Sequence, residues 1–171
     1  MKSHFAMFAL YNRWANQRLY AAAKALSDAD YRTDRGAFFG SMHGTLNHIL
    51  VADQTWMRRF TGTGPTHARL DAILHEDFAA LSKARAAEDD RIVGFIEGLS
   101  EHDLAGSFSY VTITNPTSVT QPLEPALAHF FNHQTHHRGQ AHAILTSIGG
   151  KGAGPVLDLI YFQRETGVGV A

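Results

Sequence analysis

The chain has 171 residues, a length that fits one domain, and 44% of them are hydrophobic, so a full core can form without a disulfide or a metal. Fifteen Lys and Arg against sixteen Asp and Glu leave a formal net charge of −1. This composition excludes a disordered chain and a strongly basic nucleic-acid-binding protein. No apolar run reaches the ~18 residues of a membrane-spanning helix, and the start lacks the apolar segment of a signal peptide.

We therefore expect one domain over residues 1–171, in the cytoplasm, with no membrane and no nucleic acid as partners. The chain has no cysteine, which fits a reducing compartment and removes thiolate ligands and cysteine nucleophiles from consideration. Eleven histidines remain, and they are the residues on which a prediction of function depends.

The first sixty residues predict two long helices. Aromatic and aliphatic residues recur at helical spacing over 3–26, with no proline or glycine between them. Ser27 and Asp30 then resemble a capping box at the start of a short turn. After a polar connection over 32–40, a second apolar stripe covers 41–60, and Thr61-Gly62 provides a stop signal.

The second half predicts two more long helices with an extended segment between them. The third helix is expected over 71–99, with an exposed, charged middle formed by Lys83, Arg85, Glu88, Asp89, Asp90 and Arg91. Residues 106–119 alternate loosely between apolar residues and Ser or Thr, which predicts a short extended excursion or hairpin. A fourth helix over 124–148 precedes a glycine-rich turn and a short C-terminal helix over 155–165. Four long helices with such connections indicate an all-α four-helix bundle.

The fourth helix carries five histidines: His129, His133, His136, His137 and His142. A spacing of four residues turns two imidazoles to within ~40° of each other and ~6 Å along the axis, so both can reach one ion. Two pairs, His129 with His133 and His133 with His137, have this spacing. The apolar stripe chooses between them, because His137 projects within it and His133 at its edge, whereas His129 and His136 fall about 60–80° outside.

A histidine pair that points inward must be hydrogen-bonded or metal-bound, so it forms either part of a polar core or part of a metal site. A third ligand would come from the second helix, where His43, His48 and Asp53 are candidates. Periodicity does not choose among them, since His48 projects off the apolar stripe and the other two lie nearer to it. The remaining histidines are expected at the surface: His4, His67, His75 and His102.

Three segments, on the first, second and fourth predicted helices, form a recognisable set. The fourth-helix segment reads His133-Gln134-Thr135-His136-His137-Arg138-Gly139-Gln140. The second-helix segment reads Leu46-Asn47-His48-Ile49-Leu50-Val51-Ala52-Asp53 and is followed by Trp56, and the first-helix segment reads Asn12-Arg13-Trp14-Ala15-Asn16. In this order, over most of the chain, they resemble the DinB-like family of small metalloenzymes, which includes the YfiT-like proteins.

The resemblance implies an up-down-down-up four-helix bundle in which His48, His133 and His137 hold one divalent metal ion. Three neutral imidazoles leave the charge of the ion uncompensated and one position open for water or a thiol, as in catalytic sites. Zinc is the expected ion, and nickel or iron would also accept imidazole ligands. The implied function is a metal-dependent S-transferase or isomerase that uses a low-molecular-weight thiol on a small-molecule substrate.

Two other functions stay open: a metal- or ligand-binding stress-response protein without turnover, and a metal-dependent hydrolase, although no Glu stands beside a ligand histidine. His136 is either a base close to the site or a surface residue. Arg138 either binds a carboxylate of the substrate or pairs with an acidic residue of another helix. Gln140 and Asp53 are candidates to orient the second ring nitrogen of a ligand.

A homodimer is also expected, from the family and from the apolar surface of the first helix and of the ends of the third. The aromatic residues of the first helix contribute most of it: Phe5, Phe8, Tyr11, Trp14 and Tyr20. Loops 61–69 and 106–121 are expected to select the substrate.

Overall fold

A computed structural model describes residues 1–113 and 115–170. These residues form seven helices and a two-stranded antiparallel sheet. In chain order the elements are α1 (Lys2–Lys24), α2 (Asp28–Arg32), α3 (Met42–Thr61), α4 (Phe78–Gly98), α5 (Glu101–Leu104), β1 (Ser107–Val111), β2 (Ser118–Pro122), α6 (Leu123–Gly149) and α7 (Leu159–Thr166). None of the helices in this described part combines the length and apolar character needed to cross a membrane.

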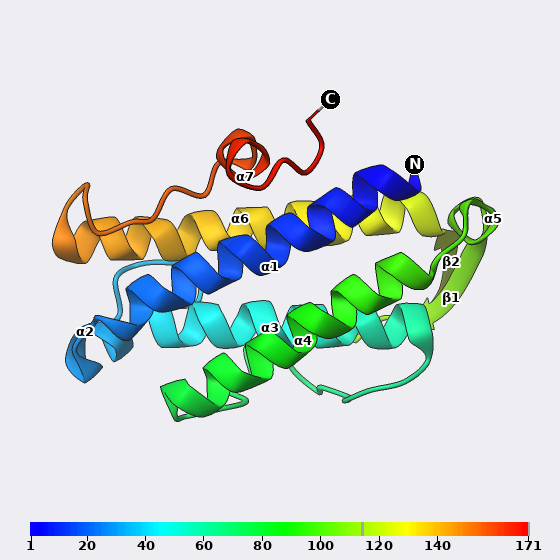
Figure 1. Cartoon of the computed structure of the whole chain (residues 1–171). Helices are drawn as coiled ribbons and strands as arrows, with labels where there is room; N and C mark the ends of the chain where they lie inside the picture. The colour runs from blue at the N-terminus through cyan, green and yellow to red at the C-terminus, as the bar shows by residue number, and fades with distance from the viewer. Residues whose placement is uncertain (114, 171) are drawn as a thin grey trace.

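The four long helices lie side by side (Figure 1), since α1 packs against α4 and α6, and α3 packs against the same two helices. Figure 1 shows α1 and α6 running in one direction and α3 and α4 in the other. The hairpin of β1 and β2 lies at the end where α1 begins, and α7 packs outside α1. The predicted extended excursion is thus confirmed as a hairpin, although Thr114 of that segment lies outside the described residues.

Local signals explain several helix ends. The side chain of Ser27 accepts a hydrogen bond from the backbone N–H of Asp30 and starts α2, as its cap pattern predicts. Gly62 has a φ of 73° and ends α3, because this left-handed conformation favours glycine. The predicted start of the last helix is wrong, since α7 begins at Leu159 rather than at residue 155.

The predicted start of the third helix is also wrong, because α4 begins at Phe78 and not at residue 71. The side chain of Asp77 caps it by accepting from the N–H of Ala80 at 2.7 Å. Residues before the cap bind to α3 instead: the side-chain oxygen of Asn47 accepts from the N–H groups of Leu74 and His75 at 2.9 and 3.0 Å. The connection over 62–77 is therefore long, and part of it lies along α3.

The core contains three apolar clusters: one at each end of the long helices, and a smaller one where Phe162 of α7 packs against Tyr11 and Ala15 of α1. Between the two end clusters, each of the four long helices also buries polar or charged residues: Asn12, Asn16, Asp53, Arg85, Asp89, Gln134 and Arg138. A buried polar layer thus crosses the centre of the molecule.

The exposed middle predicted for the third helix is therefore wrong at three of its six positions, and a fourth, Arg91, is half-buried. Arg85, Glu88 and Asp89 are 2, 5 and 3% exposed. Arg85 contacts Asp53 of α3 at 2.6 Å and Asp89 at 3.1 Å, and the side-chain amide of Asn16 donates to Asp89 at 2.9 Å. Charged side chains are buried when such partners are present, and two of the partners here, Asp53 and Asn16, come from other helices.

Candidate metal centre

Three histidines from two helices meet near the centre of α3 and α6. One ring nitrogen from each of His48, His133 and His137 lies within 4.8 Å of the others. The Nε2 atom of His137 is 3.1 Å from that of His133 and 3.2 Å from that of His48. His48 and His137 are buried, and His133 is half-buried. The structure thus brings together the three residues that the family resemblance names.

The connection after α3 covers the side of that helix from which His48 projects. The Nδ1 atom of His48 lies 2.7 Å from the carbonyl oxygen of Leu70. A carbonyl only accepts, so Nδ1 carries the hydrogen and Nε2 presents a lone pair. The ring of Phe39 stacks on the imidazole at a centroid distance of 3.7 Å and an angle of 17°. His48 is thus buried although it lies off the apolar stripe of α3, because the loop at Leu70 and the ring of Phe39 cover it.

His137 is oriented by a neighbour on its own helix. Its Nδ1 atom lies 2.8 Å from Oε1 of Gln140, while the amide nitrogen of Gln140 lies 3.2 Å from a ring nitrogen of His136. With the amide oxygen facing His137, Nδ1 donates and Nε2 is left with a lone pair. Gln140 therefore has the orienting role predicted for it.

Burial keeps these rings neutral. It lowers the pKa of His48 to about 4 and that of His133 to about 3, and it also lowers the pKa of His137. Two bare lone pairs facing each other at 3.2 Å repel unless a cation lies between them. Nitrogens bound at 2.0–2.1 Å in a tetrahedral site lie about 3.3 Å apart, so this donor set fits a divalent metal ion.

A cavity of about 720 Å³ opens beside the three histidines. Apolar residues form much of its wall: Phe38, Phe39, Ala68, Leu70 and Ile113. Arg69 and Asp71 also line it and form an ion pair at 2.6 Å. Of the loops predicted to select the substrate, only Ala68, Arg69 and Ile113 line this cavity. The sequence did not lead us to predict the two phenylalanines. Their signal was an adjacent aromatic pair in an otherwise polar connection.

The other candidates for the third ligand lie elsewhere. His43 is buried against Tyr31, with Nε2 at 3.1 Å from the carbonyl oxygen of His75. Asp53 is fully buried and binds Arg85, so its predicted role of orienting a ligand histidine is wrong.

The remaining histidines of α6 stay outside the cluster. His136 is exposed but lines the cavity, one residue from His137. His129 is exposed and packs against Trp56 at a centroid distance of 5.1 Å. His142 lies near the loop that follows α6, where it lines a separate cavity with Lys151.

The predicted pairing of Arg138 with an acidic residue of another helix is wrong. Arg138 is buried, donates to the side chains of Asn12 and Thr135, and lies 5.2 Å from the ring centre of Tyr11. No carboxylate among the described residues forms an ion pair with it. Arg138 thus belongs to the buried polar layer and does not line the cavity beside the three histidines.

The histidines expected at the surface divide into two pairs. His4 and His102 are exposed as predicted. His67 and His75 are half-buried, and a ring nitrogen of His67 lies 2.8 Å from the side-chain oxygen of Gln54. Full surface placement is therefore wrong for these two.

Comparisons with known proteins identify the family of this chain. The sequence model of the DinB family matches residues 1–159. The chain is also similar to Protein DinB of Bacillus subtilis (strain 168), with 26% identity over 167 residues, covering 91% of this chain and 92% of that protein. A match over this share of the sequence establishes the family: the chain belongs to the DinB family.

Proposed function

We propose that this protein is a metal-dependent enzyme whose divalent cation is held by the Nε2 atoms of His48, His133 and His137. The observation that carries the proposal is the 3.2 Å separation of the Nε2 atoms of His48 and His137, each of which presents a lone pair when its Nδ1 atom donates. Each ring is fixed through its other nitrogen, by Leu70 and Gln140, so neither can turn a hydrogen toward the other. Zinc is the ion we expect, and nickel and iron are the alternatives.

The protein's own residues would prepare the site for such an ion. A divalent cation on three neutral imidazoles supplies Lewis-acid activation to a water or a thiol at its open position. Phe39 and the carbonyl of Leu70 hold His48 in place. Phe38 and Ile113 offer apolar surface to the carbon skeleton of a substrate. Together these contacts orient the ligands and keep water away from the bound substrate.

The reaction we propose is transfer or isomerisation of a small electrophilic molecule with the help of a low-molecular-weight thiol. Family membership supports it, as does a cavity volume within the range of small-molecule sites. Hydrolysis has less support. Among the described residues that line the cavity, Asp71 is the single carboxylate, and it is neutralised by Arg69, which leaves no free carboxylate base.

We also propose that residues 1–171 form one domain, an up-down-down-up four-helix bundle of α1, α3, α4 and α6. The helix contacts and directions described above support this architecture.

A homodimer remains a proposal that rests on the family. Its second argument is weakened, because Tyr11 and Trp14 pack on Phe162 of α7 and Phe8 packs on Phe131. The aromatic surface of the first helix is thus largely covered within the chain. Sedimentation at the mass of one chain would contradict the dimer.

The test is elemental analysis of untagged protein prepared without added metal, followed by assays with pairs of thiol and electrophile. We expect about one equivalent of metal per chain and turnover that depends on it. His48→Ala and His137→Ala should lose the metal, whereas His129→Ala, one turn from His133 on the same helix, should keep it. Metal without turnover, together with ligand binding in the cavity, would favour the non-catalytic stress-response alternative. Failure to bind any divalent metal would overturn the proposal.

A further inference from the structure

A second cavity, of about 370 Å³, lies beside the histidine cavity. It is formed by the last turns of α3, the connection that follows them and β1, and it shares Ile113 with the first cavity. The polar side chains in its wall include Arg58, Arg59 and His67. Neither the three family motifs nor the proposed metal site uses these residues.

The charged side chains that line this cavity are all positive. Its described lining residues include two arginines and no carboxylate. No described Asp or Glu forms an ion pair with either arginine, whereas Arg69, in the first cavity, is paired with Asp71. A guanidinium confined in a cavity without a counter-charge is unfavourable, so the site favours an anion from outside the chain.

Arg59 is held rigidly in this position. Its guanidinium carbon lies 4.5 Å from the ring centre of Trp56 and 4.5 Å from that of Tyr110, so two aromatic rings fix its plane. Burial lowers the pKa of Arg59, and no carboxylate counteracts that effect, although a guanidinium stays charged at neutral pH. An ordered guanidinium loses little further entropy when it binds an oxyanion.

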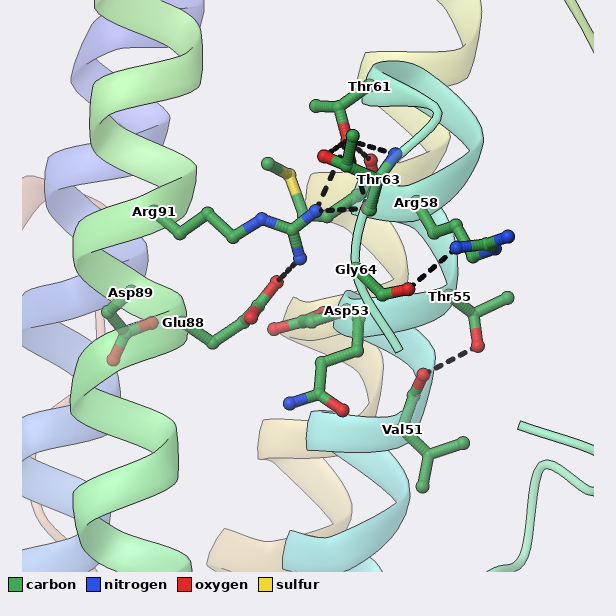
Figure 2. Close-up of polar contacts among 12 residues, drawn as sticks. Val51, Asp53, Thr55, Arg58, Thr61, Thr63, Gly64, Glu88, Asp89 and Arg91 are labelled. Carbon is green, nitrogen blue, oxygen red and sulfur yellow. Dashed lines mark hydrogen bonds and ion pairs between the residues drawn. The ribbon is translucent and has the colours of Figure 1, made fainter. Parts of the chain in front are cut away.

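The rim of the cavity is also fixed (Figure 2). One Nη atom of Arg58 donates to the carbonyl of Gly64 at 2.7 Å, and Arg91 of α4 donates to the carbonyl of Thr63 at 2.7 Å. Gly64 has a φ of 110°, a backbone conformation that favours glycine. Figure 2 shows the guanidinium of Arg58 extending beyond this contact. Its remaining N–H groups are available to a ligand.

We infer that the cavity at Arg58 and Arg59 is an oxyanion-binding subsite for the carboxylate or phosphate end of an elongated small-molecule substrate. These arginines follow His48 on α3 by 10 and 11 residues, which is about 15–16 Å along a helix axis. With the reach of the side chains, the anionic group would lie roughly 10–15 Å from the histidines. Anion binding at the two arginines does not depend on the proposed function. That the same molecule also reaches the histidines does rest on the proposed function.

The subsite is tested with inorganic phosphate on metal-free protein, followed through the side-chain Nε–H signals of arginine in NMR spectra. We expect saturable shifts at Arg59 that sodium chloride of equal ionic strength does not produce. Arg58→Gln and Arg59→Gln should each weaken phosphate binding about tenfold or more. Arg164→Gln, which removes an exposed arginine of α7, should leave it unchanged.

Each outcome of this titration either supports the subsite or overturns it. Since Arg59 also packs on two aromatic rings, the exposed Arg58→Gln carries the test if Arg59→Gln does not fold. Shifts that do not saturate, or that saturate at the same phosphate concentration in Arg58→Gln as in the parent protein, overturn the subsite. Because this titration contains no metal, it succeeds or fails independently of the metal site.

Zinc-loaded protein and dodecanedioate test whether one molecule can span both cavities. The two carboxylates of dodecanedioate lie about as far apart as the proposed distance between the anion and the histidines. We expect it to bind at least about tenfold more tightly than its monomethyl ester, which keeps the chain length but has one charge fewer. Arg58→Gln and removal of zinc should each abolish that difference. Equal affinities for the two compounds, with phosphate still bound at the arginines, would leave the subsite standing and overturn the elongated substrate.

Discussion

The Nε2 atoms of His48 and His137 face each other at 3.2 Å, and the second nitrogen of each ring donates to an oxygen, at Leu70 and Gln140. Neither Nε2 therefore carries a hydrogen, and the metal-free protein keeps two lone pairs in repulsion. A bound cation would turn this repulsion into two coordination bonds. Folding and metal binding should consequently be coupled.

The first prediction concerns thermal stability. Zinc at a free concentration about a thousandfold above its Kd should stabilise the protein by about 4 kcal/mol, which raises Tm by about 10 °C for a chain of this size. Calorimetry with zinc and with a chelator measures the difference. His129→Ala should show the same increase and His48→Ala none; an equal increase in both variants would contradict the assignment.

The second prediction concerns Gln140, which fixes the ring of His137 through Nδ1. Gln140→Leu keeps the size of the side chain but removes the acceptor, so zinc affinity should fall about 10–100-fold. Competition with a chromophoric chelator measures it. Thr146→Val, farther along the same helix, serves as the control and should leave the affinity unchanged. Unchanged affinity in Gln140→Leu would mean that the ring is held by packing alone.

The sequence alone predicts those parts of the fold that depend on local signals. The serine cap at Ser27, the glycine stop at Gly62 and the alternating residues of the hairpin act within a few residues of themselves. The start of α4 could not be predicted in this way. Residues 71–77 are helix-compatible in sequence, but Asn47, far back in the chain, binds their backbone.

In the candidate site, too, local signals predict some residues and not others. The four-residue spacing and the apolar stripe of α6 predict the inward pair His133 and His137 from one helix. His48 escapes this reasoning because its burial depends on the loop at Leu70 and on Phe39, and only the motif resemblance points to it. Likewise, Arg85 and Asp89 resemble a solvent-exposed helix face in the sequence. In the structure they are buried, because Asp53 and Asn16 of other helices contact them.

The third prediction separates the two phenylalanines of the cavity. Phe38 is 82% exposed, whereas Phe39 stacks on His48. Phe38→Ala should leave zinc affinity and Tm within error and raise KM for an apolar substrate several-fold. Phe39→Ala should weaken zinc binding, because His48 loses the ring that orients it. If Phe38→Ala weakened zinc binding as much as Phe39→Ala, both phenylalanines would support the metal ligands, and the proposed division of roles would be wrong.

The fourth prediction concerns the stability of the metal-free protein in acid. Burial lowers the pKa of His48 from 6.5 to about 4, so the unfolded chain takes up this proton at a higher pH than the folded one. Stability should be full above about pH 6.5 and fall as the pH drops toward 4, by about 3 kcal/mol at most from this residue. Urea unfolding of metal-free protein between pH 7.5 and 4.5 measures the slope. His48→Gln should reduce the slope, and an identical slope would contradict burial of the neutral ring.

The fifth prediction concerns Arg85, which lies between Asp53 and Asp89 in the buried polar layer. Arg85→Met leaves two buried carboxylates without their guanidinium and should cost about 3–5 kcal/mol, or roughly 10 °C in Tm. Lys83→Met, on the same helix but outside the buried layer, is the control and should change Tm little.

Adding Asp53→Asn and Asp89→Asn to Arg85→Met removes the stranded charges. Because an unpaired buried charge, and not the lost ion pair, accounts for most of the cost, this triple variant should recover at least half of the lost stability. Chemical unfolding of the four proteins measures the effect. A triple variant as unstable as Arg85→Met would show instead that packing of the long arginine side chain stabilises the centre of the four helices.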